Sequence, residues 1–123
     1  MEKKNHKYIS GKKRIYILNK FNNKCAYCGK DLEIATLLTD HIDNYGTNEI
    51  DNLNPCCKRC NTVKGKKSLE EFRITFSRIS HGIPSFSEEQ RLFLIDNFKI
   101  DPYDKIFDYP KSFYFEEWHN LQQ

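Results

Sequence analysis

Residues 52–65 read NLNPCCKRCNTVKG and place three cysteines, Cys56, Cys57 and Cys60, within five positions. A gap of two residues lets both sulfurs of a pair reach one ion near the Zn–S distance of about 2.3 Å. Cys57 and Cys60 have that gap, whereas three residues separate Cys56 from Cys60 and fit such a pair less well. The stretch therefore predicts one metal-binding pair and one additional cysteine.

The other two cysteines form a second pair of the same spacing, Cys25-Ala-Tyr-Cys28, followed by Gly29. The total of five cysteines is odd, and no apolar stretch of a secretory signal follows the charged N-terminus, so a disulfide framework is not expected. Two unrelated cysteine pairs in a reducing compartment are one alternative. Four thiolates with no open position are typical of structural zinc sites. We therefore predict a structural zinc ion bound by Cys25, Cys28, Cys57 and Cys60.

Charge is distributed unevenly along the 123 residues. Residues 1–30 carry nine Lys or Arg and one acid, residues 31–57 carry six acids and no Lys or Arg, and residues 58–78 carry seven bases and two acids. Two basic segments around an acidic one favour a surface that binds a polyanion, and a solvated lysine-rich surface is the alternative. No apolar run approaches the roughly 20 residues that span a bilayer, so we expect a cytoplasmic protein with no membrane partner.

Local patterns predict helices, one strand and an aromatic tail. Residues 101–118 hold seven of the seventeen aromatic residues, which favours packing onto the domain and, less often, a partner-binding or base-stacking surface. Asn22 and Asn23 are expected to end the first helix. Apolar spacing and capping boxes predict helices over residues 9–23, 57–64, 68–80 and 87–98, and a strand over residues 36–42.

The combined pattern CAYC (25–28), TDHI (39–42) and NLNPCCKRCNTVKG (52–65) resembles the HNH nuclease family in its zinc-containing form. The resemblance covers residues 25–64. It implies an α+β fold, with a small ββα-metal core that a four-cysteine zinc site holds and that helices flank. We accordingly expect an HNH domain with a basic N-terminal helix over residues 1–82. A helical, aromatic-rich extension packed on the core is expected over residues 83–123.

The resemblance also implies a role for four residues between and beside the cysteine pairs. Asp40 corresponds to the metal-binding acid and His41 to the histidine that activates water. Asn52 corresponds to the central Asn, which holds the orientation of the histidine through its backbone or its side chain, and Asn61 to the last position of an HNN-type motif. The chemistry agrees, because a histidine with an unperturbed pKa near 6.5 accepts protons at cellular pH. Asp40 and the Asn61 amide oxygen offer the oxygen ligands that Mg²⁺ or Mn²⁺ prefers.

These expectations describe a metal-dependent DNA endonuclease that hydrolyses phosphodiester bonds with a histidine general base and one divalent ion. A non-catalytic zinc-bound module that binds nucleic acid or protein is the alternative. We leave open a homodimer or larger complex formed through the C-terminal aromatic region, and the expected setting is a bacterium or a phage-infected host. Contact with the DNA phosphate backbone is expected from Lys12, Lys13, Arg14, Lys58, Arg59, Lys64, Lys66 and Lys67.

Overall fold

The computed structural model describes the backbone of residues 9–43 and 46–121, and their side chains as far as Trp118. Its contacts form two compact units. The first contains the described residues up to Leu69 and from Ser112 onward, and the second is Glu70–Lys111. The elements are α1 (Gly11–Asn19), β1 (Leu38–His41), η1 (Ile50–Asn52), β2 (Leu53–Cys56), α2 (Lys58–Lys64), α3 (Leu69–Ser80), α4 (Glu88–Phe98), α5 (Asp104–Asp108) and α6 (Tyr114–Leu121).

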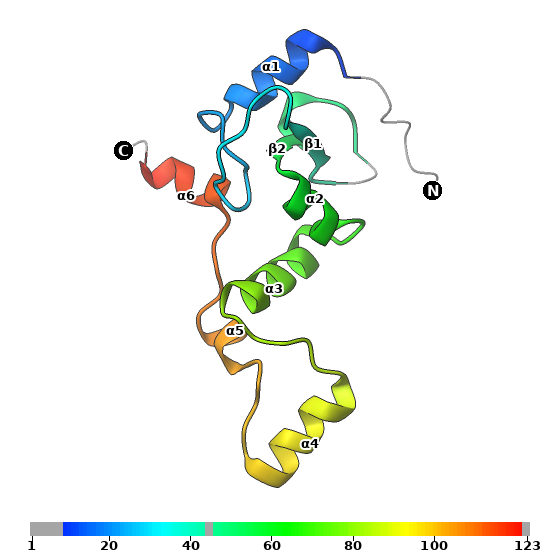
Figure 1. Cartoon of the computed structure of the whole chain (residues 1–123), viewed down its shortest axis with the longest axis vertical. Helices are drawn as coiled ribbons and strands as arrows, with labels where there is room; N and C mark the ends of the chain where they lie inside the picture. The colour runs from blue at the N-terminus through cyan, green and yellow to red at the C-terminus, as the bar shows by residue number, and fades with distance from the viewer. Residues whose placement is uncertain (1–8, 44–45, 122–123) are drawn as a thin grey trace. The chain divides into compact units, whose positions relative to one another are not determined.

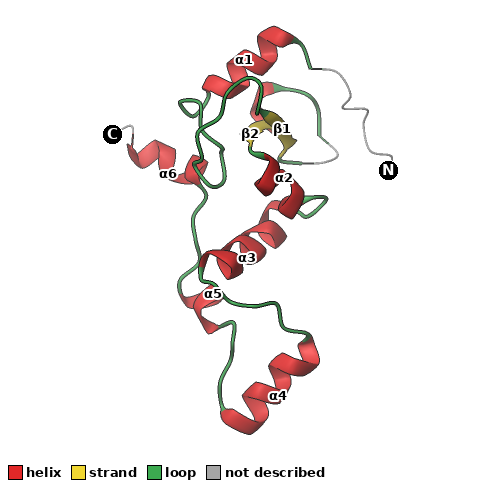
Figure 2. Ribbon diagram, in the orientation of Figure 1, coloured by secondary structure: helices red, strands yellow, loops and turns green. Residues whose placement is uncertain are grey.

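The centre of the first unit is a two-stranded antiparallel sheet of β1 and β2, which α1 and α2 contact (Figures 1 and 2). The register places Asp40 opposite Asn54 and His41 opposite Leu53. Strand β1 lies within the predicted segment 36–42, and α2 follows β2 directly. The α+β class and the small sheet with its flanking helices are therefore confirmed.

Helix α1 packs its apolar side into this unit and ends near the residues expected to stop it. Ser10 caps the helix, because its side chain accepts a hydrogen bond from the Lys13 N–H. Asn22 and Asn23 have positive φ angles of 57° and 63°, a conformation that asparagine tolerates better than most residues. Among the described residues of this unit, the buried leucine and isoleucine side chains are Ile17, Leu18, Leu32, Leu37 and Leu53.

Part of the aromatic tail packs against the turn between Cys25 and Cys28. Phe113 is fully buried, and its ring meets the ring of Tyr27 edge-on with centroids 5.1 Å apart. The backbone follows the same path, since the Tyr114 N–H donates to the Tyr27 carbonyl at 3.0 Å. The neighbouring Phe115 N–H donates to the Ala26 carbonyl at 2.7 Å. Residues 113–115 therefore support this turn.

The second unit contains α4, α5 and nearly all of α3. The predicted capping box at the start of α4 is confirmed, because Ser87 and Gln90 exchange side chain-to-backbone hydrogen bonds. Arg91 makes a two-pronged ion pair with Asp101, at 2.8 and 2.7 Å, that links α4 to the chain after it. The boundary between residues 82 and 83 stays a prediction. Among the described residues, none of the helices combines the length and the apolar character that a membrane crossing requires.

Candidate active site and metal centre

The structure brings the four predicted zinc ligands together. The sulfur atoms of Cys25, Cys28, Cys57 and Cys60 all lie within 4.8 Å of one another. The Cys28 and Cys57 sulfurs are 3.8 Å apart. A tetrahedron with Zn–S bonds of about 2.3 Å has edges of about 3.8 Å, so this spacing fits a zinc ion. Cys56 lies outside the group, and its thiol donates to the Cys57 carbonyl at 3.3 Å.

Local backbone geometry explains why each pair converges. In the first pair, the Gly29 N–H donates to the Cys25 carbonyl at 3.0 Å, and Gly29 has a φ of +78° that favours glycine. In the second pair, the Cys57 sulfur caps α2 by accepting from the Cys60 N–H at 3.4 Å. A turn and a helix N-terminus therefore aim two sulfurs each toward one point.

Crowding of the sulfurs shapes the electrostatics of this centre. The neighbouring thiols, chiefly that of Cys28, lower the pKa of Cys25. Hydrogen bonding to the Cys25 sulfur raises the pKa of Cys28 to about 11 and raises the pKa of Cys60 further. One thiolate thus suppresses ionisation of its neighbours. A dication at the centre would remove this conflict, because it favours the thiolate form of each ligand.

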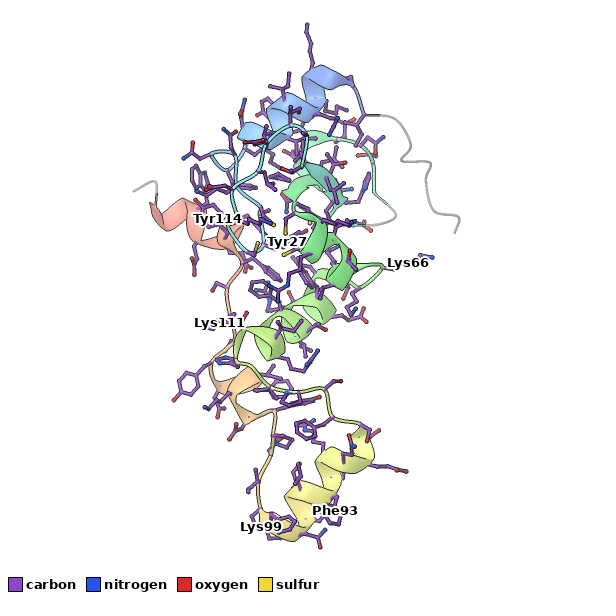
Figure 3. The ribbon with its side chains drawn as sticks, viewed as in Figure 1. Tyr27, Lys66, Phe93, Lys99, Lys111 and Tyr114 are labelled. Atoms are coloured by element: carbon purple, nitrogen blue, oxygen red, sulfur yellow. The ribbon has the colours of Figure 1, made fainter. Side chains whose placement is uncertain are left out.

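The carboxylate of Asp40 is buried and held from two sides. The Tyr27 hydroxyl donates to Oδ2 of Asp40, and the Lys64 ammonium donates to Oδ1 at 3.2 Å. Burial, together with the negative charge of Asp40, raises the pKa of Tyr27, so its hydroxyl remains a donor. Tyr27 stands between Cys25 and Cys28, and Figure 3 shows its side chain in the region of the cysteine sulfurs. The turn between Cys25 and Cys28 therefore also orients the Asp40 carboxylate.

Lys64 does not lie where the sequence analysis expected it. Its side chain is fully buried, and its ammonium donates to the His41 carbonyl at 3.2 Å as well as to Asp40. The expectation that Lys64 contacts a phosphate was wrong for this arrangement, because the ammonium is already used inside the protein. The pairing depends on a contact across 24 residues, which charge patterns along the chain do not reveal.

His41 ends β1, and its ring is oriented by a residue that the sequence analysis did not select. Its Nε2 lies 2.7 Å from Oδ1 of Asn48, in the connection between the strands. The predicted orienting residue, Asn52, acts on the chain after the histidine. Its Oδ1 accepts from the Asp43 N–H at 2.9 Å, and its Nδ2 donates to the carbonyls of Asp43 and Thr47 at 3.1 and 2.9 Å.

Asn61 is half-buried on α2, three residues before Lys64. Residues three apart share one face of a helix. Since Lys64 reaches Asp40, this face of α2 is the one directed toward β1. Tyr27 and Asn48 are the residues that sequence reasoning missed. The position of Tyr27 inside a cysteine pair was a usable signal, whereas nothing in the sequence pattern distinguishes Asn48.

The eight basic residues predicted to bind DNA differ in their surroundings. Three of them other than Lys64 donate to backbone carbonyls. Lys13 reaches Asn48 at 2.8 Å, Arg14 reaches Ile34 and Leu37 at 3.3 Å, and Lys67 reaches Val63 at 2.9 Å. The exposed members are Lys12, Lys58, Arg59 and Lys66, and Figure 3 shows Lys66 extending from the loop after α2.

The family described as HNH endonuclease matches residues 25–77. In Bacillus subtilis (strain 168), the "SPbeta prophage-derived putative HNH endonuclease YoqL" is 38% identical over an alignment of 63 positions, and the match covers 42% of this chain. The chain spans 27% of the length of that curated relative. The crystal structure of the Type II-C Cas9 enzyme from Actinomyces naeslundii matches with a TM-score of 0.47 and 25% identity, over 69% of this chain and 12% of that chain. Residues 25–77 of this chain are therefore similar to the HNH endonuclease family.

Proposed function

We propose that this protein is a metal-dependent endonuclease that hydrolyses the phosphodiester bonds of DNA, with a structural zinc ion at its four-cysteine centre. The observation that carries the proposal is the oriented pair Asp40 and His41 at the end of β1. His41 has one ring nitrogen hydrogen-bonded to Asn48, and both oxygens of Asp40 are held by buried donors. Such fixed acid and imidazole groups suit general base chemistry on water.

In this scheme His41 accepts a proton from the attacking water. A neutral imidazole is the appropriate form, and an unperturbed histidine with a pKa near 6.5 is mostly neutral at cellular pH. The zinc ion takes no part in this step, because four cysteine ligands leave it no open position. Its contribution is to hold the Tyr27 turn and the start of α2. Tyr27 contacts Asp40 directly, and α2 contacts it through Lys64 at the other end of the helix.

A second, catalytic ion such as Mg²⁺ or Mn²⁺ would be held by Asp40 and Asn61. The donor chemistry fits, because a carboxylate has about four acceptor positions and Tyr27 and Lys64 use two of them. When bound, the ion would supply Lewis-acid stabilisation of charge at the phosphate and the departing 3′ oxygen. The Lys64 ammonium beside Asp40 would oppose a dication there, so the proposal predicts weak binding of this ion.

The DNA phosphate backbone would be contacted by the exposed basic residues of the first unit, with little preference for sequence. Lys12 lies on α1, Lys58 and Arg59 open α2, and Lys66 follows it. Because the side chains of Lys13, Arg14 and Lys67 already donate within the protein, we assign them supporting roles instead.

One observation favours the alternative function, a zinc-bound binding module without catalysis. Asp40 retains only 6% of its exposure and pairs with a fully buried lysine, an environment that also suits a purely structural acid. Incubation of zinc-loaded protein with supercoiled plasmid, with and without added Mg²⁺ or Mn²⁺, separates the two functions. Omitting the added ion is a better control than a chelator, which would also remove the zinc. Nicked or linear plasmid formed only with the added ion supports the nuclease. Intact plasmid under all conditions, with DNA binding retained, supports the binding module.

A further inference from the structure

The connection between β1 and β2 contains an asparagine that touches the proposed general base. Asn48 lies seven residues after His41, and its Oδ1 is 2.7 Å from the Nε2 of His41. We propose that Asn48 is a positioning residue that keeps the proton of the neutral His41 ring on Nε2. The inference deepens the proposed function and rests on it for the catalytic consequence.

The chemistry of the two groups gives the direction of this hydrogen bond. An amide oxygen accepts hydrogen bonds and donates none, so the nitrogen that faces it must carry hydrogen. A neutral imidazole has one N–H, and its other nitrogen keeps the lone pair. A bond from Nε2–H to Asn48 therefore makes Nδ1 the basic nitrogen of His41. The opposite amide orientation would place a donor at Nε2 and select the other tautomer, which makes the tautomer a test of the proposal.

The position of Asn48 is itself fixed from outside the connection. The Lys13 ammonium, on α1, donates to the Asn48 backbone carbonyl at 2.8 Å. The Lys20 ammonium donates to the carbonyl of Ile50, two residues after Asn48, at 3.0 Å. Two lysines on or just after α1 thus hold the backbone that carries Asn48. The contacts run from Lys13 to Asn48 and from Asn48 to His41.

The opposite side of the same connection is held by Asn52. Its side chain joins the backbone of Asp43 and Thr47, at distances between 2.9 and 3.1 Å. Thr47, the residue before Asn48, is thus hydrogen-bonded to Asn52, and Asn48 itself is hydrogen-bonded to Lys13 of α1. This arrangement separates two tasks: Asn52 shapes the connection, and Asn48 contacts the ring.

The direct test is the ring nitrogen NMR spectrum of His41 in zinc-loaded protein without added Mg²⁺. The measurement is made about two pH units above the ordinary histidine pKa of about 6.5, where the ring is neutral. The signals of His41 are assigned by their loss in His41→Gln. We expect one tautomer with the proton on Nε2. A proton on Nδ1, or an even mixture of tautomers, in the wild-type protein would overturn the proposal whatever the variants do.

Variants of Asn48 then test whether its amide oxygen determines the tautomer of His41. Asn48→Leu keeps the approximate size but removes the acceptor, so the spectrum should become a tautomer mixture. Asn48→Asp keeps an acceptor oxygen and should retain the Nε2–H tautomer. Cleavage should fall about 10- to 100-fold in Asn48→Leu, as when a histidine loses its supporting partner, and less in Asn48→Asp. Wild-type tautomer and wild-type cleavage in a zinc-replete Asn48→Leu protein would contradict the inference.

Helix α1 offers a matched pair of variants for the supporting contact. Lys13→Met removes the donor to the Asn48 carbonyl and should broaden or shift the His41 ring signals. Lys12→Met removes an exposed charge one residue earlier and should leave those signals unchanged. If the two variants change the His41 ring signals equally, the hydrogen bond from Lys13 does not hold Asn48 in place. An Nε2–H tautomer in a protein that cuts no plasmid would refute the proposed function while the positioning role of Asn48 stands.

Discussion

Removal of the buried ammonium of Lys64 should destabilise the protein far more than removal of an exposed one. The side chains of Lys64 and Asp40 are 0% and 7% exposed, which places the pair among buried ion pairs. Breaking a buried pair at one partner costs about 3–5 kcal/mol, against about 0–1 kcal/mol for a surface pair. In Lys64→Met, Asp40 keeps its hydrogen bond from Tyr27, so we expect the lower end of the range, about 3 kcal/mol.

The assay is urea unfolding of zinc-loaded protein at one fixed free zinc concentration, because bound metal contributes to apparent stability. Lys66→Met is the matched control, since Lys66 is exposed and should change the free energy of unfolding by no more than about 0.5 kcal/mol. The double variant Lys64→Met/Asp40→Asn should recover about 1–3 kcal/mol of the lost free energy of unfolding, because it also removes the buried, unpaired charge of Asp40. If Lys64→Met is as stable as Lys66→Met, the buried ion pair between Lys64 and Asp40 does not stabilise the protein as predicted.

Three further predictions address the metal centre, the DNA surface and the second unit. Cys57→Ser should lose bound zinc and most of the folded structure, since structural zinc contributes on the order of 10 kcal/mol to folding. The Cys56→Ser protein should keep its bound zinc. If metal analysis finds the same zinc loss in both variants, the assignment of Cys57 rather than Cys56 as a ligand is wrong. DNA affinity should fall less steeply as salt rises from about 50 to 200 mM when Lys58, Arg59 and Lys66 are replaced together. An unchanged dependence of affinity on salt would show that these three residues do not contact the DNA backbone. In the second unit, the hydrogen bond from Arg91 lowers the pKa of Asp101 from 3.8 to about 2. Because the folded pKa lies below the unfolded one, this contribution to stability is complete above about pH 4 and is lost as pH falls through 2. An NMR titration midpoint of Asp101 near 3.8 would contradict it.

Much of the local structure could be predicted from the sequence, because it depends on contacts between near neighbours. Cysteine spacing predicted which four sulfurs converge, and the capping box at Ser87 predicted the start of α4. Strand β2 was not predicted. Its sequence, LNPC, is short and contains Pro55, a residue that interrupts most strands, and only the pairing with β1 makes it one.

The candidate site was predicted less completely, because several of its contacts join distant residues. Lys64 was predicted to contact the DNA phosphate backbone, which requires an exposed ammonium, the usual state of a lysine. Its burial against Asp40 requires α2 to pack on β1, and a charge pattern contains no sign of that packing. Asn48 was missed for the same reason, since its link to His41 follows from the path of the connection between the strands.

His41 is proposed to activate water in a phosphodiester cleavage. The most direct measurement compares the plasmid cleavage rates of wild type and His41→Ala across a Mg²⁺ titration, with both proteins loaded with zinc. His81→Ala is the matched control, because His81 lies in the second unit, where its ring contacts the Tyr109 carbonyl. We predict a loss of about 10²- to 10⁴-fold for His41→Ala that added Mg²⁺ does not rescue, with zinc content and DNA binding retained. His81→Ala should cut as wild type does. A His41→Ala protein that cuts the plasmid as fast as wild type would contradict the mechanism.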